Sequence, residues 1–261
     1  MELESEAQPK VGLAWWSEFA RAWGPAILAV LLIRTYIFEP FRIPSGSMVP
    51  TLLIGDHVLV NKSAYGLWLP WTGVDIPIVL DKVWTVPRIE VMDWGDPERG
   101  DIIVFRYPRD ESLTYIKRVV AVGGDRVEVK NNQVVVNGEL QVREYQGTYP
   151  FLDVQCHPRD TKRYVEDFGS GPHQVLTNMG TGGLLANHRE FLVPEETVFV
   201  MGDNRDNSED SRRWGIVRYD QIKGKAHLVW LSWDGCTGEY GGVRGARFFT
   251  NLYAPPEVIA D

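Results

Sequence analysis

The chain has 261 residues, of which 44% are hydrophobic, so it is long enough to bury a substantial core and too apolar for a disordered protein. Its formal net charge is −8, and no block of lysines and arginines could neutralise phosphates, so we predict that it does not bind nucleic acid. Its 25 glycines and 16 prolines, set between short apolar runs, favour a mainly β fold with many turns.

The longest apolar stretch lies near the N-terminus. A membrane-spanning helix needs about 20 mostly apolar residues. Residues 22–41, AWGPAILAVLLIRTYIFEPF, meet this length if Arg34 reaches towards lipid headgroups, and we predict a transmembrane helix there. The alternative is a buried helix at the start of a soluble domain. The flanking charges do not indicate which way the helix is oriented.

Strand patterns dominate after residue 42. The predicted strands are 56–62, 99–108, 112–125, 197–203 and 225–233. Two valine-rich runs around Asn131 and Asn132 predict a hairpin over 125–139, because asparagine tolerates left-handed backbone. Residues 140–195 are polar and predicted to be loop-rich, as in an inserted subdomain or lid.

The two cysteines, Cys156 and Cys236, show no metal-ligand spacing. In an oxidising compartment they could pair, and closing so long a loop would stabilise the fold by about 4.5 kcal/mol. This pairing is a hypothesis based on their number alone.

The stretch PSGSMVPTL, residues 44–52, constrains the backbone around Ser47, because Pro44 and Pro50 fix φ and Gly46 permits close approach of a substrate. A serine nucleophile needs a base. None of the five histidines lies in a recognisable catalytic motif, and Ser47 lacks a G-x-S-x-G elbow. A Ser-His-Asp triad is therefore possible but unsupported.

Lys117 is a second candidate base. Strand alternation in SLTYIKRVV places it on the same face as Tyr115 and Val119, a face that is otherwise apolar. A buried lysine loses its proton more readily and can then act as a general base. The alternative is a lysine that extends to solvent at a sheet edge or pairs with an acid.

The loop GDNRDNSEDSRRWG, residues 202–215, is dense in hydrogen-bonding groups. It does not fit a calcium loop, because Ser211 occupies the glycine position and Val217 the bidentate glutamate position. We expect Asp-Arg pairs and side-chain-to-backbone bonds to order it, so that it presents one hydroxyl to a buried site.

These segments, in this order and after an apolar helix, resemble the sequence boxes of type I signal peptidases over most of residues 20–235. The resemblance implies a mainly β, antiparallel β-sheet catalytic domain at 42–261, of the type shared with self-cleaving repressors. It also implies a cytoplasmic segment at 1–21, a transmembrane helix at 22–41 and an inserted subdomain at about 127–195. The catalytic domain would face the periplasm from the bacterial inner membrane.

The resemblance also assigns roles to single residues. Ser47 would be the nucleophile and Lys117 the general base, while the Ser45 hydroxyl and the Ser47 N–H would form the oxyanion hole. The expected supporting residues are Ser208, which would orient Lys117, and the ion pair of Asp210 with Arg212. Substrate pockets would be lined by Met48, Tyr115 and Ile116.

The implied activity is removal of signal peptides from exported preproteins, after Ala-X-Ala-like sites, through an acyl-enzyme and without metal or cofactor. Preproteins and membrane lipid would be the partners of a monomer. The chain departs from the family pattern at Arg218, where proline is common, and in the Trp-rich segment 66–96. An interfacial aromatic surface is expected from Trp68, Trp71, Trp84, Trp94 and residues 228–233, although core packing would explain these residues equally well.

Two other functions stay open. A self-cleaving repressor would need a DNA-binding domain in place of the apolar N-terminal segment. A membrane-anchored binding domain would use Ser47 and Lys117 only as structural residues.

Overall fold

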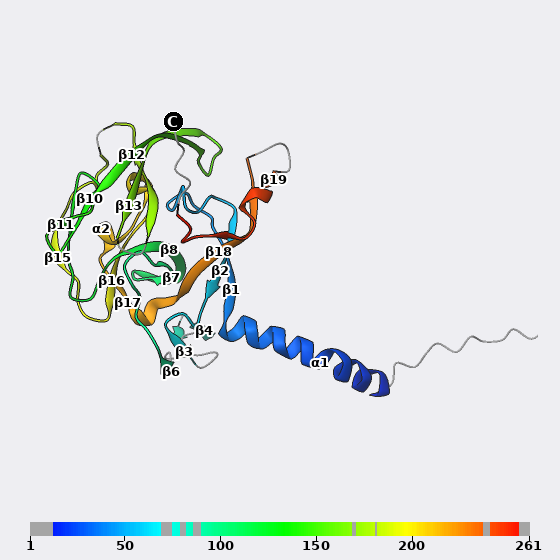
Figure 1. Cartoon of the computed structure of the whole chain (residues 1–261). Coiled ribbons are helices and arrows are strands. Elements are labelled where there is room, and N and C mark those ends of the chain that lie inside the picture. The colour runs from blue at the N-terminus through cyan, green and yellow to red at the C-terminus, as the bar shows by residue number, and fades with distance from the viewer. Residues whose placement is uncertain are drawn as a thin grey trace, which may run out of the picture.

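The computed structural model describes residues 13–68, 75–78, 82–85, 90–168, 171–180, 182–236 and 241–255. A single long helix, α1 (Leu13–Tyr36), projects from a β-rich body (Figure 1). Within it, the stretch Trp15–Tyr36 is long and apolar enough to cross a membrane, and none of it is buried inside the protein. This exposure argues against the alternative of a buried helix.

The helix bounds differ from the predicted span of 22–41. The helix begins at Leu13 and ends at Tyr36, and Phe38–Arg42 instead forms strand β1, which pairs with β2 (Asp56–Asn61). Pro40 explains the C-terminal difference, because proline has no N–H to donate to a continuing helix. At the other end, residues 13–21 contain neither glycine nor proline to stop the helix.

The main sheet has nine antiparallel strands and confirms the mainly β prediction. Its central order is β1-β2-β18-β7-β8-β16-β17, and β19 and β20 also pair with β18. The further strands of this sheet are β7 (Ile102–Tyr107), β8 (Asp110–Val122), β16 (Thr197–Met201), β17 (Val217–Arg218), β18 (Ile222–Asp234), β19 (Gly242–Val243) and β20 (Thr250–Asn251).

A second sheet contains the predicted asparagine hairpin. Strands β9 (Arg126–Lys130) and β10 (Gln133–Val136) pair around Asn131 and Asn132, which have φ values of 50° and 62°. The sheet is completed by β11 (Glu139–Leu140) and β15 (His188–Leu192). The hairpin prediction is confirmed.

The prediction of a loop-rich region over 140–195 is wrong. About half of it forms a three-stranded sheet of β12 (Arg143–Leu152), β13 (Pro158–Asp167) and β14 (Pro172–Asn178). The buried positions of β13 include Thr161, Arg163 and Glu166. Because these residues are polar, the strand shows no apolar alternation in the sequence.

Short elements complete the fold. Residues 64–98 contribute two small strand pairs, β3 (Gly66–Trp68) with β6 (Glu90–Asp93) and β4 (Asp75–Ile78) with β5 (Lys82–Thr85). The side chains of Trp68, Trp71 and Trp84 lie outside the described residues. The short helices of the described chain are η1 (Arg205–Asn207), α2 (Ser211–Trp214), η2 (Tyr219–Gln221) and η3 (Gly245–Arg247).

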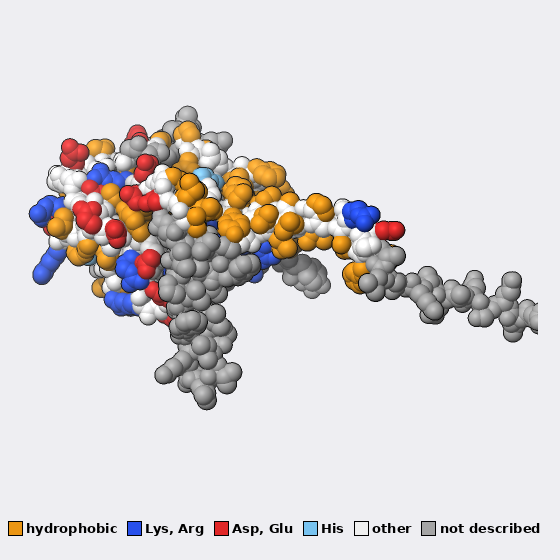
Figure 2. Space-filling view, turned by 90° about the horizontal axis from the view of Figure 1, so that it is seen from below, with side chains coloured by type: hydrophobic (Ala, Val, Ile, Leu, Met, Phe, Trp, Pro, Cys, Tyr) orange, Lys and Arg blue, Asp and Glu red, His pale blue; other side chains and the backbone are white. Residues whose placement is uncertain are grey.

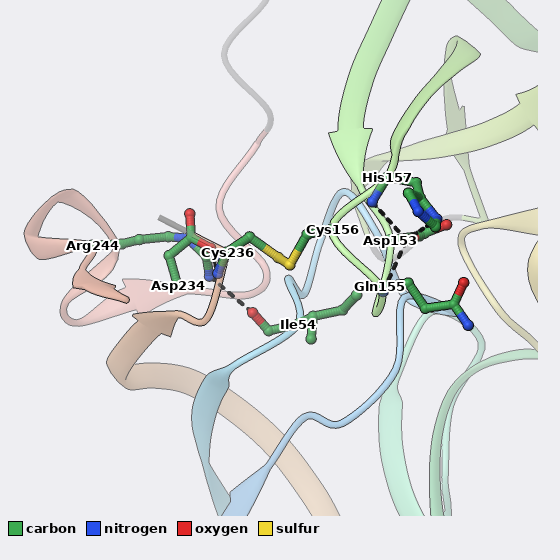
Figure 3. Close-up of a disulfide and its surroundings, with 8 residues drawn as sticks. All are labelled: Ile54, Asp153, Gln155, Cys156, His157, Asp234, Cys236 and Arg244. Carbon is green, nitrogen blue, oxygen red and sulfur yellow. Dashed lines mark hydrogen bonds and ion pairs between the residues drawn. A yellow bond between two sulfur atoms is a disulfide. The ribbon is translucent and has the colours of Figure 1, made fainter. Parts of the chain in front are cut away.

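A disulfide joins Cys156, in the turn between β12 and β13, to Cys236, just after β18 (Figure 3). The Cα atoms are 5.4 Å apart and the residues are 80 positions apart in the chain. The pairing hypothesis is thereby confirmed, and the bridge ties the three-stranded sheet to the main sheet.

Candidate active site

Ser47 and Lys117 are in direct contact in the folded chain. Ser47 follows β1 in the proline-bracketed loop, and Lys117 lies in the middle of β8. The Lys117 Nζ donates hydrogen bonds to the Ser47 Oγ at 2.6 Å and to the Ile116 carbonyl oxygen at 2.9 Å. Lys117 is only 4% exposed. It is therefore neither extended to solvent nor held by an ion pair within the described residues.

Burial changes the protonation of this lysine. Removal from water lowers the pKa of Lys117 from 10.5 to about 8, although the carboxylates of Asp210 and Asp203 oppose the shift. A substantial fraction of the amine is therefore neutral at mildly alkaline pH. A neutral amine at hydrogen-bonding distance from a hydroxyl can accept its proton.

The backbone around Ser47 is held by the loop that follows β16. The Asn204 backbone N–H donates to the Ser47 carbonyl at 3.1 Å, and the Asn204 side-chain amide donates to the Gly46 carbonyl at 3.0 Å. A Cβ atom added to Gly202 would lie 2.4 Å from the Ser47 carbonyl oxygen. Only glycine therefore lets these two backbone segments approach so closely.

The loop itself is ordered by a buried ion pair between Asp210 and Arg212. The Arg212 Nε and Nη2 donate to the two carboxylate oxygens at 2.8 and 2.7 Å. Burial would raise the pKa of Asp210, but Arg212 outweighs that effect and the pKa is lowered. The Asp210 carboxylate also accepts the Gly202 N–H at 3.1 Å. The pair thus fixes the backbone that contacts Ser47.

The predicted orienting residue, Ser208, lies close by but makes no hydrogen bond to Lys117. Its hydroxyl is buried and interacts with the Asp210 carboxyl, whose pKa it helps to lower. It packs against Gly202, whose added Cβ would lie 2.3 Å from the Ser208 Oγ. The structure thus places Ser208 beside the site without the expected bond.

A second buried network was not predicted from the sequence. The Arg118 guanidinium donates to both oxygens of Asp203 at 2.9 and 2.8 Å, and the Thr51 hydroxyl donates to the same carboxylate at 2.5 Å. Burial opposes ionisation of Asp203, yet Arg118 lowers its pKa. This network links β8, the end of the Ser47 loop and the 202–215 loop from the side opposite Lys117.

A cleft of about 680 Å³ opens beside Ser47. Ser45 is exposed in it, next to Gly46 and Ser47, and Asn204 forms part of the same wall. The opposite wall consists of residues at the ends of β12 and β13: Phe151, Asp153, Val154, Pro158, Arg159, Asp160 and Thr161.

The three residues expected in substrate pockets do not line this cleft. Met48 is fully buried and Ile116 nearly so, and both belong to the core cluster between β1, β2, β7 and β18. Tyr115 is half-buried, and its ring centre lies 5.6 Å from the Lys117 Nζ. Tyr115 therefore lies near the amine, whereas Met48 and Ile116 contribute to the core.

The chain is similar in sequence to known proteins over most of its length. Residues 16–233 match the family described as "Signal peptidase, peptidase S26". Signal peptidase I of Pseudomonas aeruginosa is 40% identical over 227 residues, covering 83% of this chain and 72% of that protein. Signal peptidase I of Aquifex aeolicus is 38% identical over 234 residues, covering 79% and 80%. The matched span includes Ser47, Lys117 and the 202–215 loop, and the chain belongs to the signal peptidase I family of hydrolases.

Proposed function

We propose that this chain removes signal peptides from exported preproteins with Ser47 as nucleophile and Lys117 as general base. Membership of the signal peptidase family supports the reaction. The observation that carries the assignment of the residues is the 2.6 Å hydrogen bond from a buried Lys117 Nζ to the Ser47 Oγ.

The chemistry follows from the neutral form of the lysine. Lys117 takes the Ser47 proton as the Oγ attacks the scissile carbonyl carbon, and the Ser45 hydroxyl and Ser47 N–H stabilise the oxyanion. Lys117 then gives that proton to the departing amine, and an acyl-enzyme remains on Ser47. A water molecule that is deprotonated by Lys117 releases the signal peptide and frees the serine.

Small residues at the cleavage site suit this geometry. Met48 and Ile116 are buried in the core, so a pocket formed against them would be shallow. We propose that these two residues and Tyr115 line the pockets for the residues that precede the scissile bond. Shallow pockets favour Ala-X-Ala-like sites, with the substrate bound as an extended strand.

The location proposed is the bacterial inner membrane, with the β-rich body on the periplasmic side. Figure 2 shows hydrophobic side chains along α1 up to the point where it joins the body. Exposed aromatic residues near the end of β18 and beyond it, Trp230, Trp233 and Phe249, suit contact with lipid. The disulfide suits an oxidising compartment. We propose a monomer, because one chain supplies every residue assigned a role.

Covalent labelling tests this function against a binding module that performs no catalysis. A lipophilic acylating inhibitor should modify the full-length protein on Ser47 alone, as mapped by mass spectrometry. The variants Ser47→Ala and Lys117→Met should both resist the label. Modification at another residue, or equal labelling of Lys117→Met, would contradict the proposal.

A further inference from the structure

The wall of the cleft that faces Ser47 comes from the turn between β12 and β13, which we call the hairpin tip (residues 151–161). A Cβ atom placed on Gly46 would lie 3.6 Å from the Phe151 ring, so this side chain is next to the Ser47 loop. Val154 is 61% exposed and also lines the cleft. The hairpin tip therefore presents apolar side chains to anything that extends from Ser47 into the cleft.

The hairpin tip is ordered by its own contacts. The Asp153 carboxylate accepts the backbone N–H groups of Gln155 and His157 at 2.9 and 3.0 Å and the Arg159 Nε at 3.0 Å. The Cys156 N–H donates to the Asp153 carbonyl at 2.9 Å. These bonds shape the turn but do not hold it against the rest of the protein.

The sheet that carries the hairpin tip is joined to the 202–215 loop through β14, where the Leu176 N–H donates to the Asp203 carbonyl and the Asn178 N–H to the Asp206 carboxylate. At the hairpin tip itself the disulfide provides the attachment to the main sheet. Within the described residues, no hydrogen bond or ion pair joins residues 144–162 to the main sheet, whereas Cys156 is bonded covalently to Cys236. On the other side of the bridge, Arg244 pairs with Asp234 and donates to the Ile54 carbonyl at 3.0 Å. Ile54 itself lines the cleft, and Figure 3 shows it beside the disulfide. The bridge thus fixes the hairpin tip relative to Ile54 and the part of the cleft that Ile54 lines.

We propose that the Cys156–Cys236 disulfide positions the hairpin tip as a binding wall for the part of the preprotein that follows the scissile bond. This inference rests on the proposed function. The pockets assigned to the residues before the bond lie around Tyr115 and Ile116, and neither residue lines the cleft. A chain that crosses Ser47 therefore continues into the cleft.

The composition of the cleft suits an extended segment of varied sequence. Its apolar members include Phe151, Val154 and Met179, and the amides of Asn178 and Asn207 offer donors and acceptors to a peptide backbone. Such a mixture binds peptide through main-chain groups and alternate side chains. Cys156, Cys236 and Val154 thus act as positioning and specificity-determining residues and take no part in bond cleavage.

A matched pair of substitutions in the full-length protein tests the proposal. Val154→Asp places a charge in the cleft, and Val142→Asp makes the same change at a site that is 80% exposed and outside the cleft. Each variant is assayed on a preprotein with its full mature part and on a peptide that ends one residue after the scissile bond. The rate of acylation of Ser47 by a small inhibitor is measured in parallel.

We expect Val154→Asp to lower kcat/KM on the preprotein by about tenfold, mainly by raising KM. The same variant should leave kcat/KM on the short peptide and the rate of Ser47 acylation unchanged. Val142→Asp should match wild type throughout. The double variant Cys156→Ser/Cys236→Ser should show the same selective loss as Val154→Asp. If the double variant fails to fold, the comparison of Val154→Asp with Val142→Asp still tests the proposal.

The inference would be overturned if Val154→Asp and wild type had equal kcat/KM on the preprotein. It would also be overturned if Val154→Asp lost the same factor in kcat/KM on the preprotein and on the short peptide. Failure of the proposed function gives a different result: acylation would then map away from Ser47 in the wild-type protein.

Discussion

The Lys117 Nζ lies 2.6 Å from the Ser47 Oγ, although 70 positions separate the two residues in the chain. Three strands separate β1 from β8 in the main sheet, and the loop that leaves β1 is held near β8 by Asn204, which donates hydrogen bonds to the Ser47 and Gly46 carbonyls. The same sheet buries the amine so completely that its hydrogen bonds go to the hydroxyl and to one backbone carbonyl. The protonation of Lys117 is therefore the property on which the following predictions depend most.

Activity should rise with pH through about 8. Burial lowers the pKa of Lys117 to about 8, and only the deprotonated amine can act as a base. About a tenth of the lysine is neutral at pH 7 and about nine-tenths at pH 9, so kcat/KM should increase about tenfold over that interval. The measurement is kcat/KM on a preprotein, with circular dichroism as a check on folding. A flat or falling profile would contradict the assignment.

Lys117→Met should be inactive but more stable than wild type at pH 7. Below pH 8 both folded and unfolded states carry the lysine charge, so the native state bears the full cost of burying it. As pH rises from about 8 to 10.5 the native lysine loses its proton first, and wild-type stability increases. Methionine removes this cost, so we expect a gain of about 1 to 3 kcal/mol at pH 7 that shrinks towards pH 10.5.

Denaturant unfolding in detergent micelles measures this difference. A Lys117→Met variant that is less stable than wild type at pH 7 would show that the amine contributes to stability rather than costing it. In that case the lysine would be a structural residue.

Asp210→Asn should destabilise the protein by about 3 to 5 kcal/mol, because it leaves the buried Arg212 guanidinium without a charged partner. A matched control lies one residue away, where Glu209 pairs with Arg213 on the surface at 2.6 Å. Glu209→Gln should cost less than about 1 kcal/mol, since exposed ion pairs contribute little. Equal unfolding free energies for the two variants would refute a special role for the buried pair.

Gly202→Ala should lower kcat/KM by about 100-fold, because the added methyl group would displace the Ser47 carbonyl or the Ser208 hydroxyl. The control is Gly180→Ala, since a Cβ at Gly180 would meet no atom within 4 Å. Preprotein cleavage and thermal unfolding should be recorded for both variants. Wild-type activity in Gly202→Ala would mean that the contact with Ser47 is not needed for catalysis.

Local sequence patterns predicted five of the nine strands of the main sheet, namely β2, β7, β8, β16 and β18. The valine runs on either side of Asn131 and Asn132 predict a hairpin because side-chain alternation and turn chemistry agree there. The strand β13 was missed because Arg163 and Glu166 occupy buried positions, and their partners are distant in sequence. Only the tertiary structure reveals that Glu166 pairs with Arg205 and that Arg163 donates to the Gln146 carbonyl.

The active-site residues were predictable to different degrees. Lys117 was identified as a charged residue on an apolar strand face. The same reasoning applied to the opposite face of β8, where Arg118 lies between Ile116 and Val120, would have identified Arg118, whose partner Asp203 sits directly after Gly202. Burial of Met48 in the core had no sequence signal, because the loop around it shows no periodicity.

The most direct test of the central claim is cleavage of a purified preprotein in detergent micelles by wild type, Ser47→Ala and Lys117→Met. We predict that wild type cuts after an Ala-X-Ala-like site and that both variants are folded and inactive. Cleavage by Lys117→Met at the wild-type rate would contradict the Ser47–Lys117 dyad and would direct the search for a base to the histidines.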